Sequence, residues 1–143
     1  MSPGYEPGQQ MSRPLFALVE SDSLQRICSV DAISRIGFDC HHFPTVHDLV
    51  AALKRGSTFE AIGVGVRPHP TGALHGLRSA CHEIAAAARV PLLFMAHHTE
   101  IVPLQVMLTE ILREAACAGF ICTPVVEEEL QFRLDLLKAG RSG

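Results

Sequence analysis

The chain has 143 residues, 48% of them hydrophobic and 19% charged, and a net charge of −3 from 12 basic and 15 acidic residues. These values are typical of one globular domain and exclude a disordered chain, and the lack of excess positive charge argues against a nucleic-acid surface. No apolar stretch reaches the roughly 18–20 residues of a membrane span, and the N-terminus lacks the features of a signal peptide, so we expect a cytoplasmic protein.

Apolar segments alternate with amphipathic ones between residues 13 and 140, which we expect to form one domain. The apolar segments predict strands at residues 15–20, 38–46, 59–66, 90–96 and 120–125. The amphipathic segments predict helices at residues 23–37, 47–56, 73–89, 97–119 and 127–140. Residues 1–12 are rich in Pro, Gly, Ser and Gln and predict a mobile tail, whereas residues 141–143 predict a terminus or linker.

Local signals refine these elements. Asp22 or Ser23 can cap the first helix, and Gly37 is suited to end it. The segment at residues 97–119 opens as a loop, and we expect Pro103 in the first turn of the helix that follows. The second strand contains His and Pro, which suit the edge of a sheet.

Strands and helices in alternation predict an α/β fold, in which a parallel sheet is covered by helices on both faces. Ligands of such sheets gather at the carboxyl ends of the strands. The residues expected at that edge are Glu20 to Asp22, His41 and His42, Arg67 to His69, His97 and His98, and Thr123 and Pro124. Gly63 and Gly65 lie within the third strand, which indicates close packing of a neighbouring element there.

Four segments, in their order and spacing, resemble the receiver domain of bacterial two-component response regulators. They are LVESDS at residues 18–23, FEAIGVGVRPHPTG at 59–72, VPLLFMAHH at 90–98 and GFICTPVVEEEL at 119–130. The resemblance implies the flavodoxin-like (βα)5 fold with strand order 2-1-3-4-5. It also implies a site for phosphoryl transfer, in which carboxylates hold magnesium and an aspartate accepts the phosphoryl group.

The resemblance places six residues at that site. Glu20 and Ser21 take the two positions of the acidic pair, and Asp22 follows them. Gly65 takes the phosphoacceptor position, Ala96 the hydroxyl position and Thr123 the lysine position. The acceptor aspartate, the hydroxyl and the lysine are therefore all replaced. The aromatic residue that receivers use in switching is retained as Phe120. We interpret the chain as a degenerate receiver, or pseudo-receiver, which is not an enzyme, needs no cofactor and does not accept phosphate from a histidine kinase.

An intact receiver pattern without its chemistry indicates a signalling module that works through protein–protein contact. The predicted fourth helix has more apolar residues than one buried stripe needs: Ile101, Leu104, Val106, Met107, Leu108, Ile111 and Leu112. We predict a homodimer, or a complex with a protein partner, formed by the fourth helix, the fifth strand and the fifth helix. Leu104, Leu108 and Phe120 are the residues expected on that face.

Two other interpretations stay open. The chain has eight histidines, so a small flavodoxin-like protein could bind a ligand or metal through His69, His97 and His98 beside Glu20. No HxxxH or HxH spacing supports this, and adjacent histidines in extended chain point to opposite sides, so we predict no metal site. Alternatively, the chain is the regulatory domain of a longer response regulator.

The five cysteines are an odd number and include no CxxC pair. Most of them lie in apolar segments, with no basic neighbour to favour a thiolate. We therefore expect small buried thiols rather than a redox sensor.

Overall fold

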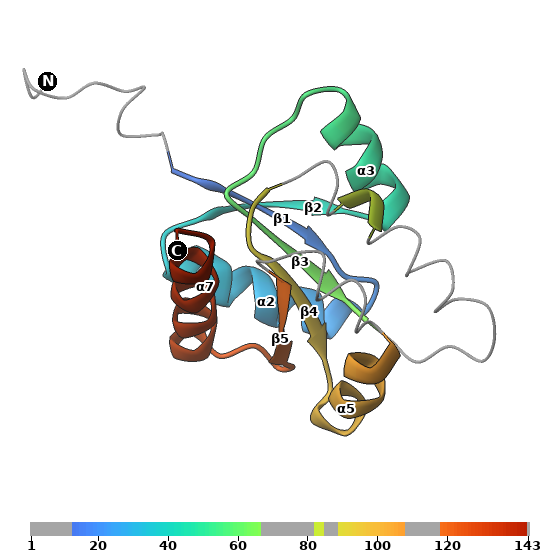
Figure 1. Cartoon of the computed structure of the whole chain (residues 1–143), viewed down its shortest axis with the longest axis vertical. Helices are drawn as coiled ribbons and strands as arrows, with labels where there is room; N and C mark the ends of the chain where they lie inside the picture. Colours follow the sequence, from blue (N-terminus) through green and yellow to red (C-terminus); the bar gives the residue numbers. More distant parts are fainter. Residues whose placement is uncertain (1–12, 67–81, 85–88, 108–117, 143) are drawn as a thin grey trace, which may run out of the picture.

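The centre of the structure, a computed structural model that describes residues 13–66, 82–84, 89–107 and 118–142, is a five-stranded parallel sheet (Figure 1). The strands are β1 (Leu15–Val19), β2 (Asp39–Phe43), β3 (Ala61–Gly65), β4 (Leu92–Ala96) and β5 (Ala118–Cys122). Their order is β2-β1-β3-β4-β5, and every neighbouring pair is parallel. The predicted fold class and strand order are confirmed, and β2 lies at an edge as its polar sequence predicted.

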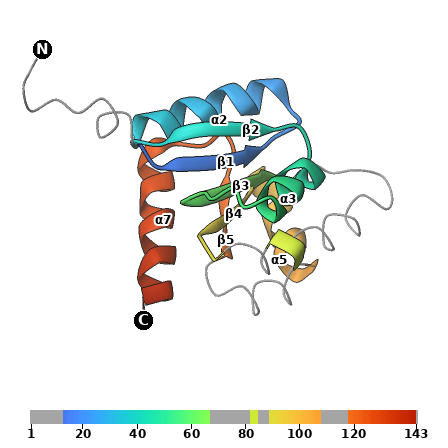
Figure 2. The same cartoon turned by 90° about the horizontal axis from the view of Figure 1, so that it is seen from above.

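Helices flank both faces of this sheet. They are α2 (Ser23–Arg35), α3 (Val46–Lys54), α5 (His98–Met107) and α7 (Glu127–Ser142). The helices α2 and α7 lie on one face of the sheet, and α3 and α5 lie on the other (Figure 2). Residues 82–84 are helical and Arg89 is not, and the other residues of the predicted third helix lie outside the described residues. Within the part of the chain that the structure describes, no helix is long and apolar enough to cross a membrane.

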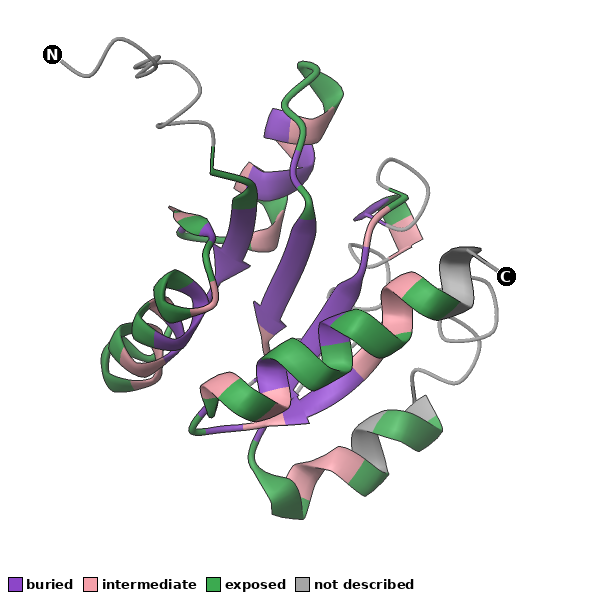
Figure 3. Ribbon diagram, turned by 90° about the vertical axis from the view of Figure 1, so that its left-hand side faces the viewer, coloured by how far each residue is buried: buried purple, intermediate pink, exposed green. Residues whose placement is uncertain are grey.

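The sheet separates two hydrophobic cores, and its central strands β1, β3 and β4 are buried on both faces (Figure 3). On the α2 and α7 side, Phe16 and Leu18 of β1 pack with Ile33 of α2 and Leu134 of α7. The opposite core includes Leu49 of α3 together with the alternate residues of β1, β3 and β4. Burial of each large apolar side chain contributes about 1.5–3 kcal/mol, so the sheet is a rigid support for the residues at its ends.

Two strands end three residues earlier than the sequence predicts. The second strand was expected to reach residue 46 but ends at Phe43. The Thr45 side chain accepts the backbone N–H of Asp48 at 3.1 Å and caps α3, which begins at Val46. The fifth strand was expected at residues 120–125 but spans Ala118–Cys122, and the Thr123–Pro124 peptide that follows is cis.

The start of α5 and the end of α7 also differ from their predicted positions. The expectation that Pro103 lies in a first turn is wrong, because α5 begins at His98 and Pro103 is its sixth residue. The ring of His97 caps this helix: its Nδ1 accepts the backbone N–H of Thr99 at 3.3 Å. At the end of the chain, α7 continues to Ser142, two residues past the predicted boundary.

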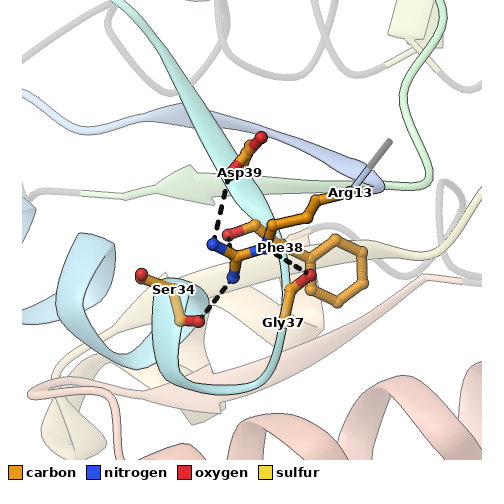
Figure 4. A network of polar contacts seen from close by, with 5 residues as sticks. All are labelled: Arg13, Ser34, Gly37, Phe38 and Asp39. Carbon is orange, nitrogen blue, oxygen red and sulfur yellow. Dashed lines mark hydrogen bonds and ion pairs between the residues drawn. The ribbon is translucent and has the colours of Figure 1, made fainter. Parts of the chain in front are cut away.

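The side chain of Arg13 fastens the start of β1 to the end of α2 (Figure 4). Its guanidinium donates to the carbonyl oxygens of Ser34 at 2.9 Å, Phe38 at 3.2 Å and Gly37 at 3.3 Å. It also pairs with Asp39 at 3.3 Å. A cation at the C-terminus of a helix satisfies carbonyls that have no partner within the helix and offsets the helix dipole.

Candidate functional site

The register of the sheet brings four of the six predicted site residues to one edge. Gly65 ends β3 and Ala96 ends β4, while Glu20 and Thr123 directly follow β1 and β5. Val19 pairs with Val64, so the next residues along these two strands, Glu20 and Gly65, are neighbours. These four residues therefore lie at one edge of the sheet, and their side chains differ from those of a receiver.

Glu20 is the central residue of this edge, and only 1% of it is exposed. Its carboxylate Oε2 accepts the backbone N–H of Asp22 at 3.1 Å. Its backbone carbonyl accepts a hydrogen bond from Nε2 of His42, also at 3.1 Å. Glu20 thus connects the end of β1 to the start of α2 and the end of β2.

The carboxylate of Glu20 lies directly over Gly65. A Cβ atom placed on Gly65 would lie 2.5 Å from Cδ and 2.7 Å from Oε2 of Glu20, and closer still to Oε1. Gly63, on the same face of β3, is also closely packed, since a Cβ there would lie 2.5 Å from Cε of Met95 and 3.0 Å from Cε1 of Phe16. The prediction that these two glycines mark close packing is confirmed, and at Gly65 the neighbouring group is a carboxylate.

Asp22 and Ser21, the other residues near the predicted acidic pair, are exposed. The Asp22 side chain accepts the backbone N–H of Gln25 at 2.9 Å, so it is the N-cap of α2. The choice between Asp22 and Ser23 as cap is thereby settled in favour of Asp22. Its Oδ1 is used in helix capping, which leaves Glu20 as the buried carboxylate of this edge among the residues described.

At the ends of β4 and β5, the residues of this edge are buried and carry no charge. Ala96 is fully buried, and its carbonyl accepts the backbone N–H of Thr123 at 2.9 Å. Thr123 is buried too. Phe120 is buried against Phe94, with 5.5 Å between the ring centroids, so in this structure its ring belongs to the core.

These residues do not fit the magnesium site that the fold family implies. Magnesium is held by several oxygen ligands, mostly carboxylates and waters. Here the Glu20 carboxylate accepts a backbone hydrogen bond, Asp22 caps a helix, and Gly65 has no side chain. Across residues 13–66, 82–84, 89–107 and 118–142, no group of three or more His, Cys, Asp or Glu side chains is arranged to hold a metal ion.

The histidines of this edge are placed differently from the prediction. His97 and His98 were expected to point to opposite sides, but their rings lie 4.2 Å apart, because residue 98 is already helical. Both are exposed. In β2, where the chain is extended, His41 stacks on Phe43 at 4.4 Å while His42 contacts Glu20. His69 lies outside the described residues.

The predicted contact face can be traced only in part. Leu108 lies outside the described residues, as does the side chain of Leu104. The exposed apolar residues seen on α5 are Val102 and Val106, which are 66% and 74% exposed. They are four residues apart and therefore lie on one side of the helix. Val106 is among the surplus apolar residues predicted from sequence, whereas Val102 is not.

No protein-family model matches the chain, and no curated protein matches it by sequence. Solved structures do match it. The N-terminal domain of a response regulator/sensory box/GGDEF 3-domain protein from Carboxydothermus hydrogenoformans has 16% sequence identity and a TM-score of 0.67, over 90% of this chain and 97% of that one. The chain has the receiver-domain fold.

Two further structures agree with this fold. The signal receiver domain of a putative Luxo repressor protein from Vibrio parahaemolyticus has 18% identity and a TM-score of 0.63, over 91% of this chain and 94% of that one. A protein named adenylate cyclase from Rhodopirellula baltica has 13% identity and a TM-score of 0.65, over 91% and 90% of the two chains. At such low sequence identities the likeness establishes the receiver fold alone. The function has to be inferred from the residues of the site.

Proposed function

We propose that this chain is a pseudo-receiver, a signalling module that acts through protein–protein contact and independently of phosphorylation. The observation that carries the proposal is the end of β3. A receiver forms an acyl phosphate on a carboxylate at this position, and here the position is Gly65, with the carboxylate of Glu20 over it. Without an acceptor oxygen on β3, a phosphodonor has no nucleophile there.

The positions that assist phosphoryl transfer in a receiver are also changed. The charge on a transferring phosphoryl group is offset by a metal ion and a lysine. Thr123 at the lysine position is neutral and buried, and Ala96 at the hydroxyl position has no hydroxyl. The intact sheet and two intact cores indicate that the fold is retained for a purpose other than this chemistry.

Contact is proposed on the face formed by α5, the edge strand β5 and α7. Val102 and Val106 are exposed on α5, and Leu136 is half-exposed on α7. Lys138 of α7 lies over the ring of Phe38, on the side toward α2. Residues two apart on a helix are separated by about 200°, so Leu136 points away from the buried Leu134 and lies on the exposed side of α7. These apolar side chains favour association, and a symmetric homodimer is the arrangement we propose.

The experiment is sedimentation of the chain at micromolar concentration, with and without acetyl phosphate and magnesium. We expect a dimer whose dissociation constant is unchanged by the phosphodonor. Val106→Glu should weaken association at least about tenfold, because a charge then replaces apolar contact at the interface. Ile27→Glu is the matched control, since Ile27 is 64% exposed on α2, a helix that is not part of the proposed face.

Equal effects of Val106→Glu and Ile27→Glu would contradict the assignment of the face. A monomer under all conditions would contradict self-association. Association that tightens with acetyl phosphate would contradict independence of phosphorylation.

A further inference from the structure

The contact between Glu20 and Gly65 is closer than packing alone requires. A Cβ atom at position 65 would approach three atoms of the Glu20 carboxyl group to less than 3 Å, and these are the three atoms nearest to it outside the adjacent residues. Real Cβ atoms do not make such contacts, so the carboxyl group fills the volume in which any side chain at position 65 would begin. Glu20 can adopt this position only because residue 65 is glycine.

The carboxyl group is also held in place from its own side. Its Oε2 accepts the N–H of Asp22, and the backbone carbonyl of Glu20 is held by His42. The residue is 1% exposed. A carboxylate fixed in this way at the end of β3 stands where a receiver has its acceptor side chain, although it comes from β1.

We propose that Glu20 is the built-in occupant of the acceptor position, and that Glu20 and Gly65 form one interlocked pair. The inference rests on the proposed function, and it adds how the site is regulated. The Glu20 carboxylate connects the ends of β1 and β3 to the start of α2 at all times. This edge of the sheet therefore has a single arrangement, which forms without phosphorylation. The module is constitutive because the group that fills its site is part of its own chain.

The interlock has a consequence for attempts to restore phosphorylation. An aspartate at position 65 would share its space with the Glu20 carboxylate, and two carboxylates in contact cannot both ionise readily. Gly65→Asp alone therefore disturbs the edge instead of restoring an acceptor. Moving the carboxylate from β1 to β3, with Glu20→Ala and Gly65→Asp together, removes the conflict.

The test is a double-mutant cycle read by thermal unfolding of the full chain. Gly65→Ala adds one methyl group and should lower the melting temperature by about 3–10 °C, the usual range for overpacking in a chain of this size. In the Glu20→Ala background the same substitution should lower the melting temperature by less than about 2 °C, because the obstructing carboxylate is gone.

Gly63→Ala is the matched control on the same face of β3. The three atoms nearest to its Cβ would belong to Met95 and Phe16 rather than to Glu20. Its loss of melting temperature should therefore be the same in both backgrounds, within about 2 °C. Equal losses for Gly65→Ala in the two backgrounds would overturn the interlock, since the conflict would then lie with another group.

A second comparison covers the case in which Gly65→Ala does not fold. The Glu20→Ala, Gly65→Asp double variant should fold and melt at a higher temperature than Gly65→Asp alone. Failure of the double variant to fold, or a single variant as stable as the unmodified chain, would overturn the inference. None of these results depends on phosphorylation, so an acyl phosphate on the unmodified chain would refute the proposed function separately.

Discussion

Replacing Asp22 by alanine removes the cap of α2, and the geometry sets the size of the effect. Asp22 Oδ1 accepts one exposed backbone N–H, that of Gln25, at 2.9 Å. Loss of such a cap costs about 0.5–2 kcal/mol, so we expect the free energy of unfolding to fall by about 1 kcal/mol. With an unfolding entropy of about 2.1 cal/mol/K per residue, 1 kcal/mol corresponds to about 3 °C of melting temperature for this chain of 143 residues.

The assay is thermal unfolding followed by circular dichroism, with and without millimolar magnesium. Asp22→Asn is the matched control, because asparagine caps helices about as well as aspartate, and we expect its melting temperature to stay within about 1 °C of the unmodified chain. Magnesium should change none of the three melting temperatures. The reasoning is refuted if Asp22→Asn loses as much as Asp22→Ala, or if magnesium stabilises only the unmodified chain, because Asp22 would then act as a charged ligand.

Two further predictions concern groups away from the site. Arg13→Ala should lower the free energy of unfolding by about 1–2 kcal/mol in urea denaturation, since three carbonyls lose a charged donor that is partly exposed. Arg13→Lys should recover only part of this free energy. No loss in Arg13→Ala would show that the network of Figure 4 does not stabilise the fold. Burial raises the pKa of Cys40 from 9.0 to about 11, so the unfolded thiol ionises first and stability should fall as the pH rises from 9 to 11. Cys40→Ala should flatten the free energy of unfolding over that range, and an unchanged slope would contradict the burial of this thiol.

The strands could be predicted from sequence because most are buried on both faces. Residues 16–19 of β1 and all of β4 are buried, and such strands are continuous apolar runs. Boundaries were harder, because single capping groups decide them. The Thr45 side chain caps the start of α3. The ring of His97 caps the start of α5, although histidine is not a common N-cap. A histidine cap gives no signal that separates it from a loop residue, so the start of α5 was placed too late.

The places of Glu20, Gly65, Ala96 and Thr123 at the ends of the strands could be predicted, because the resemblance aligns one residue with the end of each of these strands. Their arrangement could not. The position of Glu20 over Gly65 depends on the register between β1 and β3 and on the direction of one buried side chain. The sequence showed an acid at position 20 and glycines at positions 63 and 65. It did not show that the carboxylate of Glu20 is the group that packs on Gly65.

The central claim, that the chain cannot use a phosphodonor, is tested most directly by intact mass spectrometry. The unmodified chain is incubated with acetyl phosphate and magnesium beside a receiver that retains its acceptor aspartate. We predict a phosphoryl adduct on the control receiver and an unchanged mass for this chain, because Gly65 offers no carboxylate. A labile, acyl-phosphate adduct on this chain, at Glu20 or at any other carboxylate, would contradict the account.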